Sequence, residues 1–153
     1  MNLLGMLRSR TEQTVLQTLN ISIESAEADL VVLSMPVDAA VHQYTGLLHG
    51  GVSVVLAETA ASIGAALNTD LSRFTPVGVE INANHLRPVT RGRVRASASP
   101  VYVGRQMTVW AIEIKDDRDR LICTSRCTLA FKPGSALADK EDSSGVNTVE
   151  SNP

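Results

Sequence analysis

One carboxylate stands alone in the most hydrophobic segment of this 153-residue chain. Glu58 is the single formally charged side chain between Asp38 and Asp70. It follows the glycine pair Gly50 and Gly51 by a little over two helical turns. A carboxylate in apolar surroundings is costly unless it is paired or hydrogen-bonded. Glu58 therefore requires either a partner or a chemical function.

The segment that carries Glu58 is predicted to be one long helix over residues 50–67. It is apolar on nearly every side and rich in alanine and glycine, which predicts a buried helix in close contact with a neighbouring surface. The first N–H groups of a helix lack intrahelical partners, so a tip at Gly50 can stabilise an oxyanion. The Glu58 carboxylate would lie farther along the same helix. The loop that leads into the helix can reach the space beside the helix tip and this carboxylate. The candidate catalytic residues are Gln43, His49, Gly50, Glu58 and Ser62.

Each of these residues also has an ordinary structural explanation, and the sequence leaves both open. A glycine pair before a helix is often only a tight turn. A lone carboxylate such as Glu58 can pair with an arginine of a neighbouring strand or subunit. His49 alone is more typical of a structural histidine than of a catalyst, and Gln43 alone is typical of a solvated loop. Together these residues favour a catalytic site, which no single one of them would indicate.

The rest of the chain predicts an antiparallel sheet around this helix. Residues 9–19 suit a short amphipathic helix, and residues 21–37 suit a hairpin that turns near 26–29. Residues 92–104 alternate apolar and polar side chains with the period of two expected of a sheet with one buried face. The separators between the later segments are short enough for antiparallel neighbours. The strand-like segments after the long helix are 76–89, 92–104, 106–117 and 120–132.

This order predicts an α+β domain over residues 1–132, with the antiparallel sheet curled around one central helix. The exposed sheet edges predict pairing with another copy of the chain. Residues 133–153 contain no aromatic and almost no bulky apolar side chain, which predicts a disordered tail.

Composition excludes several classes of function. The 14 Lys and Arg against 16 Asp and Glu give a net charge of −2 and no general reason to bind nucleic acid. Five arginines and no acidic residue fall between residues 81 and 110, which forms one local basic region. Cys123 and Cys127 lie about 13 Å apart on one strand, too far to pair, and no third ligand accompanies them for a metal. No signal peptide or run of membrane-spanning length is predicted, so we expect a cytoplasmic protein.

Three motifs carry a resemblance to a known family. "GLLHGGVSVVLAETAAS", "VGVEINANHLRPVTRGRVRASASPVYVGR" and "VWAIEIKDD" fall in register over residues 20–132. The chain resembles the hotdog-fold thioesterases of the 4-hydroxybenzoyl-CoA and phenylacetate-degradation type, within the subgroup that includes the 1,4-dihydroxy-2-naphthoyl-CoA hydrolases and the proofreading thioesterase of enterobactin synthesis. The resemblance implies hydrolysis of an acyl-CoA, with an aromatic acyl group, and no cofactor beyond the CoA of the substrate.

The resemblance also implies a role for each candidate residue. Glu58 matches the nucleophile or general base, and Gly50 matches the residue whose N–H polarises the thioester carbonyl. Gln43 and His49 match polar residues that bind that carbonyl or orient water and the thiol, while Ser62 matches a small hydroxyl residue past the carboxylate. The residues that match the CoA-binding region are His85, Arg87 and Arg105. Family members are dimers that pair into tetramers, with active sites between subunits.

Two other functions stay open. A hotdog dehydratase also sets a histidine against a carboxylate, but it typically carries a Gly-His-Phe-Pro loop and a longer gap than the nine residues between His49 and Glu58. A non-catalytic acyl-CoA sensor would need an attached DNA-binding module, which the N-terminal 20 residues are too short to supply.

Overall fold

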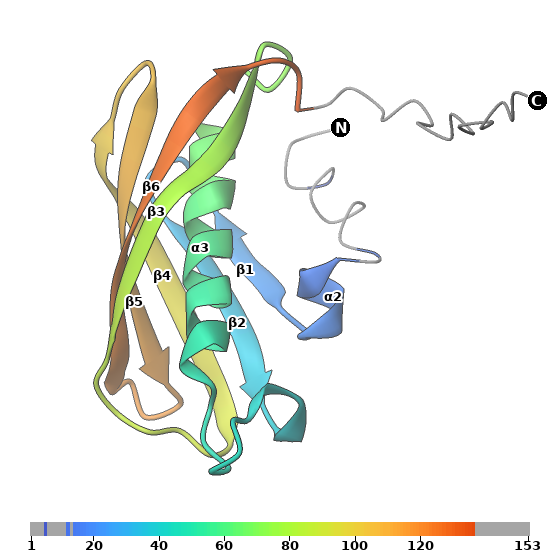
Figure 1. Cartoon of the computed structure of the whole chain (residues 1–153), viewed down its shortest axis with the longest axis vertical. Helices are drawn as coiled ribbons and strands as arrows, with labels where there is room; N and C mark the ends of the chain where they lie inside the picture. The colour runs from blue at the N-terminus through green and yellow to red at the C-terminus, as the bar shows by residue number, and fades with distance from the viewer. Residues whose placement is uncertain (1–4, 6–11, 13, 137–153) are drawn as a thin grey trace, which may run out of the picture.

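One long helix lies along a curved antiparallel sheet (Figure 1). The computed structural model describes residues 5, 12 and 14–136. The helices are α2 (Val15–Thr18), the 3₁₀ turn η1 (Ala39–Val41) and α3 (Gly50–Leu67). The strands are β1 (Ser22–Ala26), β2 (Val31–Val37), β3 (Phe74–His85), β4 (Gly92–Val103), β5 (Met107–Asp116) and β6 (Leu121–Pro133). All neighbouring strands are antiparallel, in the order β1-β2-β4-β5-β6-β3.

Most of the predicted elements are confirmed. The long helix has the predicted bounds, and β1 and β2 form the predicted hairpin with Glu27 and Leu30 bonded across the turn. In β4 the residues Val94, Ala96 and Ala98 are buried, as the alternation predicted. The helix predicted over 9–19 is shorter, because α2 spans four residues and much of the remainder lies outside the described residues. The chain stays hydrogen-bonded to residues 71–73 through residue 136, and the rest of the predicted tail lies outside the described residues.

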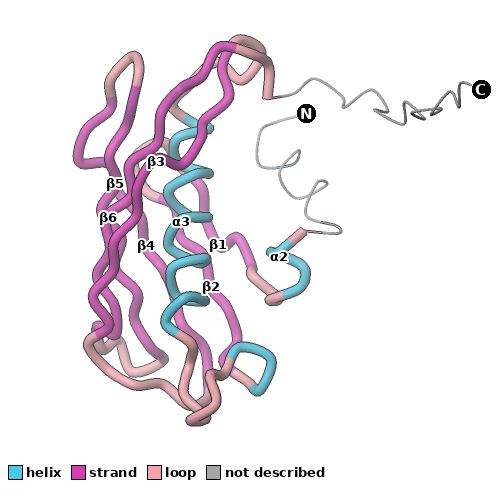
Figure 2. Tube along the Cα trace, in the orientation of Figure 1, coloured by secondary structure: helices cyan, strands magenta, loops and turns pink. Residues whose placement is uncertain are grey.

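The expectation that β3 and β4 are neighbours is wrong. Strand β3 pairs with β6 at the sheet edge, whereas β4 pairs with β2. The connecting segment 86–91 passes below the start of α3, where Figure 2 shows it as the long loop. Backbone hydrogen bonds from Leu86 to Ile122 and from Leu48 to Val89 hold it there. The sheet curls around α3, so β3, the strand that follows this helix, lies at the far edge of the sheet. It does not pair with β2 of the first hairpin.

Small residues on α3 allow the helix to lie very close to the sheet. A Cβ atom at Gly64 would lie 2.3 Å from the ring of Trp110, whose side chain is completely buried in β5. The helix is less buried than predicted, however, because Val54, Glu58 and Ser62 share one face that is only half-buried in the single chain. By length and composition alone α3 is apolar enough to cross a membrane, although no run of that length was predicted. Here it packs on the sheet, with nine buried residues.

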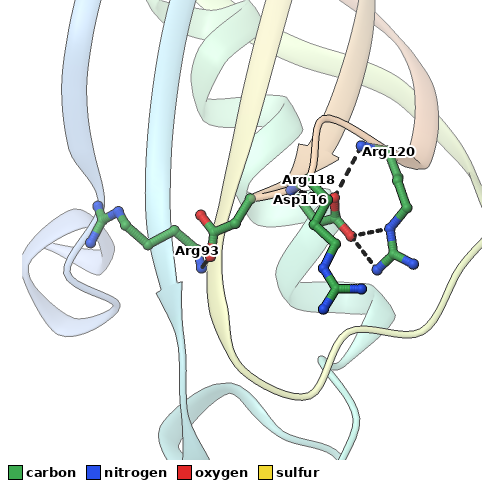
Figure 3. A network of polar contacts seen from close by, with 5 residues as sticks. Arg93, Asp116, Arg118 and Arg120 are labelled. Carbon is green, nitrogen blue, oxygen red and sulfur yellow. Dashed lines mark hydrogen bonds and ion pairs between the residues drawn. The ribbon is translucent and has the colours of Figure 1, made fainter.

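The turn between β5 and β6 is held by one carboxylate (Figure 3). The Arg120 guanidinium donates to Asp116 at 2.6 and 2.8 Å, and the backbone N–H groups of Arg118 and Arg120 donate to the same side chain at 3.0 Å. The Arg120 side chain, with help from the two backbone donors, lowers the pKa of Asp116 from 3.8 to about 2.

We expect Asp116→Asn to lower the free energy of unfolding at pH 7, with a difference from wild type that disappears in acid. The folded carboxyl has the lower pKa, so its stabilisation is complete above pH 3.8 and is lost as the pH falls to about 2. Urea unfolding at several pH values measures this. Asp119→Asn is the control, because that carboxylate is 86% exposed. A difference that stays constant down to pH 2 would contradict the assignment.

Candidate active site

The N-terminus of α3 is capped by His49. Its Nδ1 accepts a hydrogen bond of 2.9 Å from the backbone N–H of Gly51. A neutral imidazole that accepts at Nδ1 carries its proton on Nε2. The side chain is exposed and is not among the residues that line the neighbouring cavity. In this chain, therefore, His49 supports the helix tip and leaves the adjacent Gly50 to face the cavity.

Gly50 presents an available backbone donor at the helix tip. Its N–H has no hydrogen-bond acceptor within the described part of the chain. A Cβ atom at this position would lie 2.7 Å from Nε2 of His85. Glycine thus allows the imidazole at the end of β3 to approach the first turn of α3.

A cavity of about 330 Å³ lies beside this helix tip. It brings Gln43, Gly50, His85 and Arg87 together, because the loop before α3 and the segment after β3 both pass the same end of the helix. Gln43 is fixed by a 2.8 Å hydrogen bond from its side-chain amide to Thr45. The remaining lining residues are mainly apolar: Leu47, Leu48, Ser53, Leu86, Pro88, Val89 and Ile122. Such a wall suits an apolar group, with the polar residues clustered at one place.

Glu58 lies outside this cavity. It is about 12 Å farther along the helix axis than Gly50, at 1.5 Å per residue. Its Oε1 lies against β3, where a Cβ atom at Gly78 would be 2.5 Å away. The half-buried carboxylate has no hydrogen bond or ion pair within residues 14–136, so no arginine of a neighbouring strand pairs with it in the described part of this chain. Pairing with an arginine of another subunit stays a prediction.

Cys127 lies close enough to the Glu58 carboxylate to be affected by its charge. Burial, followed by the negative charges of Glu58 and Glu80, raises the pKa of the Cys127 thiol to about 12. Burial likewise raises the pKa of Cys123. Both cysteines are free, as the sequence predicted, and both are buried, and neither is a thiolate at neutral pH. No cluster suited to hold a metal ion occurs among the residues that the structure describes.

The other predicted site residues lie elsewhere on the chain. Ser62 is half-buried one turn beyond Glu58, on the same side of α3. Arg105 is in the β4–β5 turn and lines a separate hollow at the C-terminal end of α3, together with Asn68 and Phe74. A single chain therefore gathers Gln43, Gly50, His85 and Arg87 at one end of the helix and leaves Arg105 at the other.

Other residues of the predicted basic region serve the fold. Arg95 forms an ion pair with Glu24 at 2.8 Å, and the Arg93 side chain donates to the Ser34 hydroxyl at 2.8 Å. Sequence reasoning also missed one cavity residue, Ser53. Its spacing of three residues from Gly50 places both on one helix face, which is the feature that would have indicated it.

Comparisons with known proteins identify the family of the chain. The profile of the thioesterase superfamily matches residues 45–123. The 1,4-dihydroxy-2-naphthoyl-CoA hydrolase of Listeria monocytogenes is 47% identical over 116 residues, which are 76% of this chain and 94% of that protein. The proofreading thioesterase EntH of Klebsiella pneumoniae is 43% identical over 123 residues, 80% of this chain and 89% of that one.

A solved thioesterase from Haemophilus influenzae superposes with a TM-score of 0.81 at 39% identity, covering 92% of this chain and 96% of that chain. This likeness agrees with the predicted fold of an antiparallel sheet around one central helix. The chain therefore belongs to the thioesterase superfamily, has the hotdog fold and is a thioester hydrolase.

Proposed function

We propose that this enzyme hydrolyses an acyl-CoA whose acyl group is aromatic, of the 1,4-dihydroxy-2-naphthoyl, benzoyl or phenylacetyl type. The observation that carries the proposal is the unpaired, half-buried carboxylate of Glu58 on the same helix whose tip offers a free N–H beside an apolar cavity. The names of the relatives from Listeria monocytogenes and Klebsiella pneumoniae support the choice of reaction and acyl class. A sensor would have no need for an unpaired carboxylate at this position.

The reaction breaks the C–S bond of the thioester and forms a C–O bond with oxygen from water, which releases a carboxylic acid and the CoA thiol. The Gly50 N–H would bind the carbonyl oxygen, Gln43 would orient the reacting groups, and His49 would hold the Gly50 N–H in position by capping the helix. Glu58 would act in one of two ways. It attacks the carbonyl carbon and forms a mixed anhydride that water then cleaves, or it removes a proton from the attacking water. Ser62 would contact the carboxylate side of the site.

Two copies of the chain are required for this site. A reacting carbonyl must lie within about 3 Å of both its donor and its nucleophile. Gly50 and Glu58 of one chain are about 12 Å apart along the helix, so the donor and the carboxylate would come from different subunits. Strand β3, which contacts Glu58, is an open edge with Val79 63% exposed. A second copy seated there would complete a dimer, and two dimers a tetramer.

His85 and Arg87 would bind the phosphates of the CoA nucleotide at the mouth of the cavity, and Arg105 would contribute from another subunit. We expect Arg87→Gln to raise KM for an acyl-CoA about tenfold with little change in kcat, because an exposed guanidinium binds the phosphate equally in the ground and transition states. The matched substrate is the acyl-pantetheine thioester, which lacks the nucleotide and should show no change. An equal loss with both substrates would contradict a phosphate-binding role.

The proposed function is tested by steady-state hydrolysis of a panel of thioesters, with the free thiol detected by a disulfide dye. The panel contains 1,4-dihydroxy-2-naphthoyl-CoA, benzoyl-CoA, phenylacetyl-CoA and straight-chain acyl-CoAs. We expect one aromatic class to be the best substrate. Preference for a straight-chain acyl-CoA would contradict the aromatic assignment, and tight CoA binding without turnover would favour the sensor.

A further inference from the structure

Ser53 differs from every other buried hydroxyl in the described part of the chain. Only 2% of its surface is exposed, yet its hydroxyl has no hydrogen-bond partner among the described residues. The other buried hydroxyls each have one, at 2.7–2.8 Å: Ser34 with Arg93, Thr108 with the Tyr102 carbonyl and Ser125 with the Asn82 carbonyl. A buried polar group without a partner is destabilising, so the Ser53 hydroxyl requires a partner other than the folded chain itself.

The Ser53 hydroxyl also fails to bond its own helix. Thr59, six residues farther along α3, donates to the Val55 carbonyl at 2.7 Å in the usual way for a helical hydroxyl. Ser53 makes no such bond to the carbonyl of His49. Its oxygen is therefore available as a donor of one hydrogen bond and an acceptor of two.

The free hydroxyl opens onto the cavity. In the described part of the chain, Trp110 Nε1 is the one side-chain nitrogen or oxygen that is both completely inaccessible to solvent and without a hydrogen-bond partner. The Ser53 oxygen also has no partner, so it must keep some accessible surface. The space beside it is the cavity that Ser53 lines. Helical side chains lean toward the N-terminus and residues three apart share a face, so this hydroxyl covers the turn of Gly50.

We infer that the Ser53 hydroxyl is a second hydrogen-bond donor to the thioester carbonyl, beside the Gly50 N–H. A carbonyl oxygen has two lone pairs and can accept from both groups. The negative charge that develops on it in the tetrahedral transition state strengthens both bonds, since charge-assisted hydrogen bonds are stronger than neutral ones. This role rests on the proposed thioester hydrolysis and adds a catalytic residue to it.

The test compares two buried serines that differ in their partners. We expect Ser53→Ala to lower kcat for the best aromatic acyl-CoA by about 10²-fold with KM changed less than about threefold, because the bond matters most in the transition state. Its thermal midpoint should match or exceed that of wild type, since no fold contact is lost. Ser34→Ala should do the reverse, lowering the midpoint by loss of the Arg93 bond while leaving kcat unchanged.

Binding of phenacyl-CoA separates ground-state from transition-state effects. This thioether keeps a carbonyl but has no scissile thioester bond, so Ser53→Ala should bind it nearly as tightly as wild type in calorimetry. A kcat within twofold of wild type, or a loss of phenacyl-CoA affinity equal to the loss of kcat, would overturn the inference while leaving thioester hydrolysis intact. Failure of wild type to hydrolyse any thioester of the panel would overturn the proposed function itself, and this inference with it.

Discussion

Replacement of Glu58 by alanine is expected to abolish thioester hydrolysis, lowering kcat at least about 10³-fold, without unfolding the protein. The carboxylate is the one candidate base or nucleophile on the α3 face that also carries Ser62. Loss of the side chain should cost little stability, because Glu58 makes no hydrogen bond or ion pair in the described part of the chain. Removal of an unpaired charge from an apolar surface can even stabilise the fold.

The measurement is steady-state turnover of the best panel substrate together with a thermal melt. Glu27→Ala is the matched control, since Glu27 is an exposed carboxylate in the β1–β2 turn. Glu58→Gln keeps the size of the side chain and should be equally inactive, because an amide is neither a base nor a nucleophile here. Hydrolysis by Glu58→Ala at the wild-type rate would contradict the mechanism. A large drop in thermal midpoint would instead assign Glu58 to the fold or to an ion pair across subunits.

Gly64→Ala is expected to destabilise the protein by about 2 kcal/mol, although alanine is the better helix former by about 1 kcal/mol. The new Cβ would lie 2.3–2.7 Å from three atoms of the Trp110 ring. Trp110 is fully buried, so neither the ring nor the helix can move away cheaply. We expect the thermal midpoint to fall by about 4–8 °C for a domain of this size.

A double-mutant cycle checks the cause. Trp110→Phe shortens the ring that meets Gly64, so Gly64→Ala should cost less in the Trp110→Phe background than in wild type, with a coupling of about 1 kcal/mol or more. Urea unfolding of the four proteins gives this value. Strict additivity would show that the ring contact does not limit the approach of α3 to the sheet.

Local patterns in the sequence were sufficient for most of the elements. The apolar run after the glycine pair determined α3 at both ends, and the period of two determined which face of β4 is buried. The bounds of a helix and the buried face of a strand depend on residues that are close in the sequence, which explains why these two predictions were confirmed. The position of β3 depends instead on how the sheet closes around the helix, so the short separator before β4 was misleading.

For the candidate site too, some features follow from the sequence and others only from the fold. The residue types and their spacing indicate an oxyanion donor and a lone carboxylate on one helix, and the resemblance to the thioesterases implies the acyl transfer chemistry. The fold places His85 and Arg87 beside Gly50, which follows from the crossover of segment 86–91 below the helix. The eight-residue spacing along the predicted helix already separates Gly50 from Glu58 by about 12 Å, so this distance follows from the sequence and not from the tertiary structure.

The sequence by itself determined the α+β class and the central helix, since these depend on periodicity within short segments, and three of its motifs resembled those of the hotdog thioesterases. Only the tertiary structure decided which residues share the cavity, that His49 caps the helix, that Arg105 lies at the opposite end and that Ser53 is buried without a partner among the described residues. Burial of a side chain and its hydrogen-bond partners depend on contacts between segments that are distant in the sequence. They are therefore established only when the sheet closes around the helix.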